Sequence, residues 1–397
     1  MLSSKRWLLI FLITPIFLAG CWGKIEIENR GFVIGTAIDL EGKQGNEKYN
    51  LLMTNQLINP AAISKQSSGG GGGGNQKGFI NIQDKSDSLF AASRKMRHLT
   101  NLIPYYQHLK VILVSEEVIK EPGLFSDVMD VFVRNHELRR GVKVFVTEGE
   151  ANKILDFVPQ IEKTPAMFIE KLTTNSKNAG ILEPKRVDRL QNIFIYERSY
   201  FIPRVKLVNN EIVYDDAVIV SGENNQMIGT LNSEETKGLL YILGGTKGGS
   251  IETKFDDNLV NVETQSAKVK TKLTNKDKEN FTFSLNINFE GTIEEHFGTK
   301  DLLKEKSITE IEKDLEKDIK QLVERTIKKV QREYKADVIG LGDVIREKHY
   351  DLWKNIVYNW DRGENYFSKS TVEVNVKANI SSTGAANRIK QKGKRGE

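Results

Sequence analysis

The chain has few of the residues from which chemical sites are usually built. It contains one cysteine, Cys21, among 397 residues. A single cysteine excludes an intrachain disulfide framework and any zinc site made of several cysteines. The histidines are His98, His108, His136, His296 and His349. No two of them stand three or four residues apart, so the sequence predicts no metal-binding pair on a helix.

Catalytic motifs are also missing or broken. "HELRR" begins like the zinc-protease motif H-E-x-x-H, but Arg140 stands where the second histidine is needed. "GLGDVI" has Ile345 in place of the last glycine of G-x-G-x-x-G, and "GGTKGGS" has Lys247 in the wrong order for a phosphate loop. No serine lies in G-x-S-x-G. We therefore predict no enzyme, no cofactor and no metal site, although a catalytic pair of carboxylates stays open.

Neither charge nor hydrophobicity is concentrated enough to name a partner. The net charge is +5, which becomes +5 − 2 = +3 without Lys5 and Arg6 if the chain begins at residue 21. Nucleic-acid binding, which needs a concentrated basic face, is not predicted. The uncharged run Trp7–Ala19 has thirteen residues, short of the roughly 20 that a membrane-spanning helix needs.

The start of the chain is typical of a lipoprotein leader. Two positive charges precede the apolar run, and small residues end it, as in a secretory signal peptide. "LAGC", residues 18–21, resembles the bacterial lipobox. We predict cleavage between Gly20 and Cys21, with Cys21 becoming an S-diacylglycerol cysteine and N-acylation left open. Two acyl chains hold a protein on a membrane stably. The alternative is an ordinary signal peptide or uncleaved anchor with a chance cysteine.

Alternating hydrophobic patterns predict strands and helices in the first half. Strands are expected at 30–42, 48–58, 78–83, 108–119 and 141–149, and helices from Ser86 or Asp87 to His98, at 124–135 and at 150–157. Six glycines, 69–74, predict a flexible loop at 67–77, because glycine loses the most entropy on ordering. A phosphate-binding loop would need a lysine and a helix directly afterwards, and neither is there.

The second half begins with a predicted helix at Ser233, for which Asn232 or Ser233 is the N-cap and Glu235 a first-turn acid. The glycine-rich stretch 244–250 predicts a hinge. Strands with one solvated face follow from 251, and then a long amphipathic helix over 308–334. We expect that helix to lie across a sheet; a calmodulin-like or membrane-surface helix is the alternative. Asp343 is expected to cap another helix, and 370–381 to form a closing strand.

We predict an α+β protein with three mixed α/β domains in series after a lipoprotein signal peptide; length alone allows two or three domains. We place the signal peptide at 1–20, an N-terminal domain at 21–200 and a small middle domain at 201–250. A C-terminal domain follows at 251–381, and a basic, disordered tail at 382–397.

Residues 19–41, "AGCWGKIEIENRGFVIGTAIDLE", resemble the start of the C-subunit lipoproteins of spore germination receptors, the Ger(x)C family. The matching positions are Gly20, Cys21, Trp22, Glu26, Ile27, Gly35, Ile38 and Asp39. Gly23 departs from the pattern, in which aspartate is common there. Further matching blocks are 138–155, 229–245 and 337–356, and the last contains Asp337, Gly340, Gly342 and Trp353.

This resemblance implies a palmitate-bearing, membrane-bound subunit of a germinant receptor in the spore inner membrane, on its extracytoplasmic face. It implies two integral-membrane partners, of the A and B types, and a response to nutrients such as amino acids or sugars. It implies no catalytic activity, and only Cys21 is carried over as a site residue, since germinant contact is unknown. Two alternatives stay open: a solute-binding lipoprotein of a transporter, with two similar lobes, and a wall-active or maturation enzyme on a lipid tether.

Overall fold

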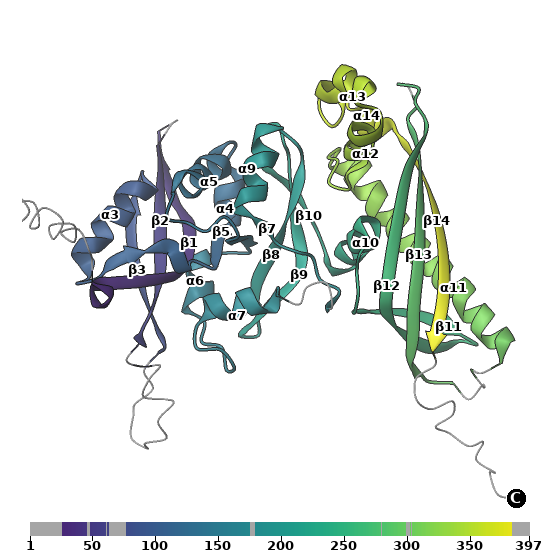
Figure 1. The fold of residues 1–397 in the computed structure, drawn as a ribbon, viewed down its shortest axis with the longest axis horizontal. Helices are drawn as coiled ribbons and strands as arrows, with labels where there is room; N and C mark the ends of the chain where they lie inside the picture. The colour runs from purple at the N-terminus through teal and green to yellow at the C-terminus, as the bar shows by residue number, and fades with distance from the viewer. Residues whose placement is uncertain are drawn as a thin grey trace, which may run out of the picture.

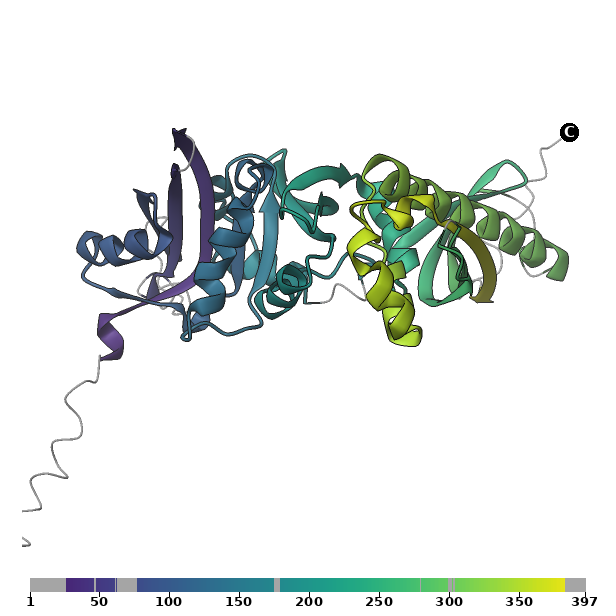
Figure 2. The same ribbon diagram turned by 90° about the horizontal axis from the view of Figure 1, so that it is seen from above.

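The computed structural model describes residues 26–382, except for 46–47, 61, 63–76, 175–178, 279, 299–301 and 303. The predicted leader with Gly20 and Cys21, the glycine run and residues 383–397 of the tail lie outside the described residues. The described chain is elongated, with one sheet in each half (Figures 1 and 2).

The first half is built on a mixed ten-stranded sheet in the order β10-β9-β8-β6-β5-β1-β2-β3, with β4 beside β1 and β7 beside β6. Its middle strands β1, β5, β6 and β8 are parallel, whereas the outer pairs are antiparallel. The strands are β1 (Arg30–Gln44), β2 (Lys48–Ile58), β3 (Phe79–Ser86), β4 (Ile103–Tyr105), β5 (Val111–Ser115), β6 (Lys143–Thr147), β7 (Lys185–Arg186), β8 (Tyr200–Val208), β9 (Glu211–Val220) and β10 (Met227–Leu231).

Helices cover both faces of this sheet. In β5, Ile112 and Val114 belong to one core and Val111 and Leu113 to the other, which is why a central parallel strand is apolar at every position. α3, α5 and α9 contribute to the first core, and α6 and α7 to the second. The helices are η2 (Ile27–Asn29), α3 (Leu89–Leu99), η3 (Tyr106–His108), α4 (Glu116–Lys120), α5 (Leu124–Arg134), α6 (Ala151–Asp156), α7 (Pro165–Leu172) and α9 (Val187–Ile195).

The second half is a four-stranded sheet, β11-β12-β13-β14, with the long helix α11 packed on one face (Figure 1). The amphipathic stripe predicted for this helix is confirmed, since Ile311, Leu315 and Ile319 are buried. The elements are α10 (Ser233–Leu243), β11 (Ser250–Phe255), β12 (Asn258–Asn275), β13 (Thr282–His296), α11 (Glu305–Lys328), the π-helical turn η4 (Lys329–Glu333), α12 (Leu341–Lys348), α13 (Tyr350–Ile356), η5 (Val357–Asn359), α14 (Tyr366–Lys369) and β14 (Thr371–Ser382).

One hydrophobic core joins the two halves. Phe201, Ala217 and Ile219 of β8 and β9 belong to the same buried cluster as Leu239 and Ile242 of α10 and the apolar face of α11. The predicted middle domain, 201–250, is thus divided between the halves. Its strands β8, β9 and β10 extend the first sheet, and its helix α10 packs in the core of the second half. The division into three domains remains a prediction.

The glycine-rich stretch after α10 is tied to β12. The N–H groups of Gly245 and Gly248 donate to the carbonyls of Ala267 and Thr264 at 2.8 and 2.7 Å. The N–H groups of those two residues donate back to Thr246 and Gly249 at 3.1 and 2.9 Å. A hinge motion at 244–250 would therefore have to break four backbone hydrogen bonds.

Several local predictions can be compared with the structure. Asn232 caps α10 in a reciprocal capping box with Glu235, as the sequence predicts. The strand predicted over 108–119 is wrong at both ends, because His108 closes η3, β5 begins at Val111, and 116–120 form α4. The helix expected from Ser86 or Asp87 is instead capped by the Ser88 hydroxyl. Asp343 is not an N-cap: it lies inside α12, and a different aspartate binds the start of that helix.

Candidate functional site between the two sheets

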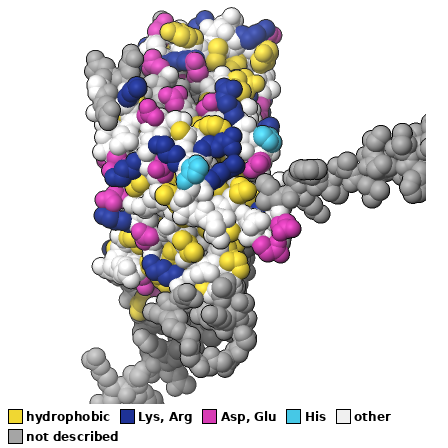
Figure 3. Space-filling view, turned by 90° about the vertical axis from the view of Figure 1, so that its left-hand side faces the viewer, with side chains coloured by type: hydrophobic (Ala, Val, Ile, Leu, Met, Phe, Trp, Pro, Cys, Tyr) yellow, Lys and Arg dark blue, Asp and Glu magenta, His cyan; other side chains and the backbone are white. Residues whose placement is uncertain are grey.

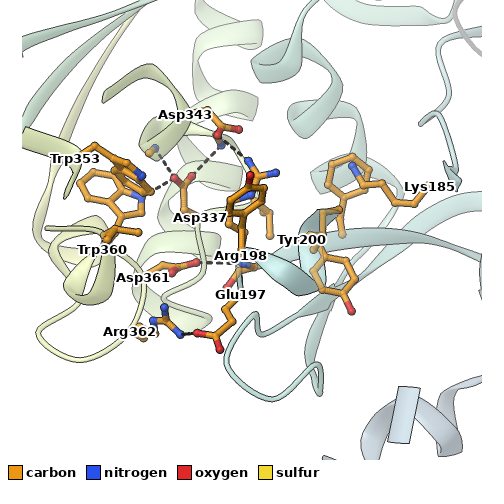
Figure 4. A pocket seen from close by; sticks show the side chains of 18 of the residues that line it. Lys185, Glu197, Arg198, Tyr200, Asp337, Asp343, Trp353, Trp360, Asp361 and Arg362 are labelled. Carbon is orange, nitrogen blue, oxygen red and sulfur yellow. Dashed lines mark hydrogen bonds and ion pairs between the residues drawn. The ribbon is translucent and has the colours of Figure 1, made fainter. Parts of the chain in front are cut away.

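The candidate site lies where the end of the first sheet meets the helices of the second half. A cavity of about 220 Å³ is lined there by residues 196–201, near the start of β8, and by the segment 337–362. Figure 4 shows that the side chains of Arg198 and Glu197 extend from one half toward Asp343 and Arg362 of the other. The site is thus made by both halves together.

Asp337 organises the wall from the second half. Its Oδ1 accepts hydrogen bonds from the N–H groups of Gly340 and Leu341 at 2.8 and 3.0 Å. Its Oδ2 accepts from the N–H of Gly342 at 2.6 Å and from the indole N–H of Trp360 at 2.7 Å. Desolvation raises the pKa of Asp337 to about 6, although the bonds from Gly342 and Trp360 lower it part of the way. At neutral pH the carboxylate is ionised, which suits the start of a helix.

Gly340 and Gly342 have separate reasons to be glycine. Gly340 has φ of +79°, a left-handed conformation that favours glycine. A Cβ on Gly342 would lie 2.7 Å from Nε1 of Trp360 and 3.0 Å from the ring of Trp353. The two tryptophan rings pack edge to face, with centroids 6.2 Å apart. The matching block at 337–356 therefore packs together around Asp337: its carboxylate binds the tight turn at Gly340 and Gly342, and the rings of Trp353 and Trp360 cover that turn.

Asp39, from the matching block at 19–41, likewise accepts hydrogen bonds from the first N–H groups of a helix, here α6 in the first half. Asp39 is 5% exposed at the end of β1's buried stretch. Its two oxygens accept from the N–H groups of Ala151 and Asn152 at 2.6 and 2.9 Å, at the start of α6. Burial raises its pKa to about 6, against those hydrogen bonds. Gly35, in the same strand, leaves room for α7, since a Cβ there would lie 2.7 Å from that of Ala166.

Polar contacts cross between the halves at the cavity. Arg198 Nη1 donates to Asp343 Oδ1 at 2.7 Å, and the N–H of Ser199 donates to Asp361 Oδ2 at 3.3 Å. Arg362 pairs with Glu197. Because these three consecutive residues of the first half each bind a different residue of the second, the contact fixes orientation as well as distance.

Four residues of this wall, Asp337, Gly340, Gly342 and Trp353, match the family pattern in the sequence, but the sequence did not predict that they form a site. Trp360, Arg198 and Lys185, which also line the cavity, lie in no matched position. Their proximity depends on how the halves dock, which local patterns do not encode. Gly20 and Cys21 lie outside the described residues. Within the described ranges, no group of three or more histidine, cysteine, aspartate or glutamate side chains could hold a metal ion. Nor is any described helix long and apolar enough to cross a bilayer.

The fold and the site define a two-part α+β protein whose halves are joined by one hydrophobic core. Two family models match in sequence order: the spore germination protein N-terminal domain over 23–207, and the "Spore germination B3/GerAC like, C-terminal" model over 216–384. A crystal structure of the GerBC protein is similar in fold, with a TM-score of 0.59 and 21% identity over 89% of this chain and 99% of that one.

The curated relatives agree with this class. Spore germination protein YndF of Bacillus subtilis (strain 168) is 30% identical over 394 residues, covering 95% of this chain and 96% of the relative. Spore germination proteins B3 and A3 of the same organism are 28% and 29% identical over 90% and 94% of this chain, and over 93% and 96% of their own length. The chain belongs to the GerAC-like, or Ger(x)C, family of spore germination proteins.

Proposed function

We propose that the chain is a lipid-anchored, non-enzymatic subunit of a spore germinant receptor, needed for the response to small nutrients. The observation that carries this proposal is the match along the whole chain: relatives named as spore germination proteins cover it almost from end to end. The lipobox-like "LAGC" supplies the anchor through Cys21. The partners in this proposal are two integral-membrane subunits, and the location is the extracytoplasmic face of the spore inner membrane.

The end of the molecule at which the first described strand begins suits a membrane surface. β1 begins beside β4, which follows α3 closely in the chain. Exposed Arg94, Lys95 and Arg97 lie on α3, with Phe90 63% and Leu99 59% exposed. Figure 3 views this end and shows lysine and arginine side chains gathered near its middle, among scattered acidic ones. Basic and apolar side chains at this end would help a lipid on Cys21 to hold this face on anionic lipid.

The solute-binding alternative predicts two similar lobes. The two halves instead have different sheets, a mixed ten-stranded one and a four-stranded one. This difference supports a receptor subunit over a protein that closes two equivalent lobes around a solute.

The test is Cys21→Ala in sporulating cells, with the amount of protein in the spore membrane and the germination response both measured. We expect membrane retention and nutrient response to fall together, because the soluble domains lose their high effective concentration at the partner subunits. Ser3→Ala is the matched control, since it alters the leader and leaves Gly20 and Cys21 intact. Normal retention and normal germination of the Cys21→Ala spores would refute the anchor. Failure of the wild-type protein to co-purify with any membrane subunit would refute the receptor assignment.

A further inference from the structure

A second, larger cavity adjoins the first. It measures about 930 Å³ and shares Lys185, Arg198 and Phe201 with the smaller one. Its remaining walls come from 181–196 of the first half, from the end of α10 and the glycine-rich stretch after it, and from Arg346 of α12. A volume of this size is in the range of small-molecule sites, which occur preferentially between domains.

Positive charge outweighs negative charge around this cavity. The five cations that line it are Lys185, Arg186, Arg189, Arg198 and Arg346, and the lining carboxylate is Glu183. Two further carboxylates pair with these cations from outside the lining: Asp188 with Arg186, and Asp343 with both Arg198 and Arg346. Five positive charges against three negative ones leave an excess of two.

Lys185 lies against an aromatic ring and has no carboxylate within ion-pair distance in the described part of the chain. Its ammonium lies 3.7 Å from the centre of the Phe201 ring. Among the residues that the structure describes, no hydrogen bond or ion pair to this ammonium is found. Desolvation lowers the pKa of Lys185 to about 8, against the attraction of Glu183. Lys185 is half-buried, so its ammonium is partly desolvated yet still reachable, and an anion that enters the cavity could pair with it.

The arginines are also incompletely satisfied. Arg198 and Arg346 both bind the same oxygen of Asp343, at 2.7 and 3.0 Å. Each keeps its Nε without an acceptor within the described part of the chain. One carboxylate shared by two guanidinium groups leaves this side of the cavity positive.

We propose that this cavity binds a small organic carboxylate. The carboxylate would pair with the Lys185 ammonium, and the apolar part would lie against Phe201, Tyr196 and Leu243. A monoanion with an apolar part fits better than inorganic phosphate, because a single ammonium without a hydrogen-bonded partner stands beside an aromatic and aliphatic wall. The binding is a property of the isolated chain and does not depend on its role in a receptor.

The experiment is isothermal titration calorimetry of the purified full chain with benzoate, with benzyl alcohol as the neutral analogue and with inorganic phosphate. We expect benzoate to bind, benzyl alcohol to bind at least tenfold more weakly, and phosphate more weakly than benzoate. Lys185→Met should weaken benzoate at least tenfold, whereas Lys185→Arg, which keeps the charge, should restore most of the affinity. Lys354→Met is the matched control, since Lys354 also lies over a ring, that of Tyr350, but outside the cavity.

A second variant guards against a folding defect in Lys185→Met. Arg189→Gln changes an exposed cation of the lining and should weaken benzoate about threefold without altering the melting temperature. Equal binding of benzoate and benzyl alcohol would overturn the proposal, as would benzoate binding that is unchanged in both variants. Tighter binding of phosphate than of benzoate would overturn the assignment to a carboxylate.

Discussion

The indole N–H of Trp360 donates to the Asp337 carboxylate at 2.7 Å, across 23 residues of sequence. The same oxygen accepts from the N–H of Gly342 at the start of α12. Asp337 therefore joins the first turn of α12 to the ring of Trp360, which lies beyond α13 and η5 in the chain. Asp361, directly after that ring, binds the N–H of Ser199 in the other half. The carboxylate thus supports the surface on which the first half docks.

We first predict that Asp337→Asn destabilises the protein. Each carboxylate oxygen of Asp337 accepts two hydrogen bonds. The asparagine amide has only one oxygen, so it can accept at only one of these two positions. The amide NH₂ would then face two donors. Leaving such groups unsatisfied costs about 1–3 kcal/mol. Urea unfolding followed by tryptophan fluorescence measures this loss. Asp351→Asn on α13 is the control, since the Asp351 side chain is 95% exposed. An Asp337→Asn protein as stable as wild type would show that these four hydrogen bonds add nothing to the free energy of unfolding.

The pH dependence of stability is the second prediction. Asp39 and Asp337 both have pKa values raised to about 6, so the folded state holds protons on them that the unfolded state has already released. Their contribution to the free energy of unfolding is fully present below about pH 4, and it is lost as the pH rises toward 6. A carboxyl group with such a change loses about 3 kcal/mol over that window.

The check is carbon-detected NMR titration of the side-chain carboxyl groups, combined with urea unfolding between pH 4 and 7. We expect two carboxyl resonances to titrate near pH 6. Asp39→Asn should remove one of them and flatten the stability curve between pH 4 and 6. If every aspartate titrates near pH 4, desolvation does not dominate at these two positions.

Third, Gly342→Ala should disturb the tryptophan pair. The added methyl group would lie 2.7 Å from Nε1 of Trp360, so the ring or the helix start must shift. Overpacking of this kind costs about 1–3 kcal/mol. Near-ultraviolet circular dichroism should show a changed tryptophan signal, and urea unfolding should show the lower stability. Gly141→Ala is the control, because a Cβ there meets nothing within 4 Å. Equal effects of the two substitutions would contradict the packing argument.

The comparison of sequence and structure separates local from long-range information. Alternating and helical patterns predicted β5, α5, α11 and the Asn232 cap, since these depend on burial periodicity and on neighbours within four residues. The sequence did not predict α7, α9 or the role of Asp337 at α12. Nor did it predict that Arg198 pairs with Asp343, 145 residues away. Such contacts follow from the docking of the two halves through a shared core, which no local pattern specifies.

Fourth, the Arg198–Asp343 pair should contribute little to stability but affect how the halves are held. The two side chains are 32% and 40% exposed, and ion pairs with that much solvent contact are worth about 0.2–1 kcal/mol. A double-mutant cycle with Arg198→Met and Asp343→Asn, measured by urea unfolding in low and high salt, gives the coupling. We expect it to shrink as salt rises. A coupling above about 2 kcal/mol would place the pair among buried ones.

The last prediction concerns the exposed basic face of α3. Replacing Arg94, Lys95 and Arg97 by glutamine should reduce binding of the purified protein to vesicles that contain anionic lipid. Each basic group near such a surface adds about 1 kcal/mol, so we expect a loss of at least tenfold that diminishes with salt. The charge-matched control replaces Lys313, Lys317 and Lys320, which are exposed on α11 in the other half. Because both triple variants lose the same net charge, only a face that meets the membrane makes them differ. Equal loss in the two variants would show that net charge alone draws the protein to lipid, and would remove the support that α3 gives to the proposed orientation.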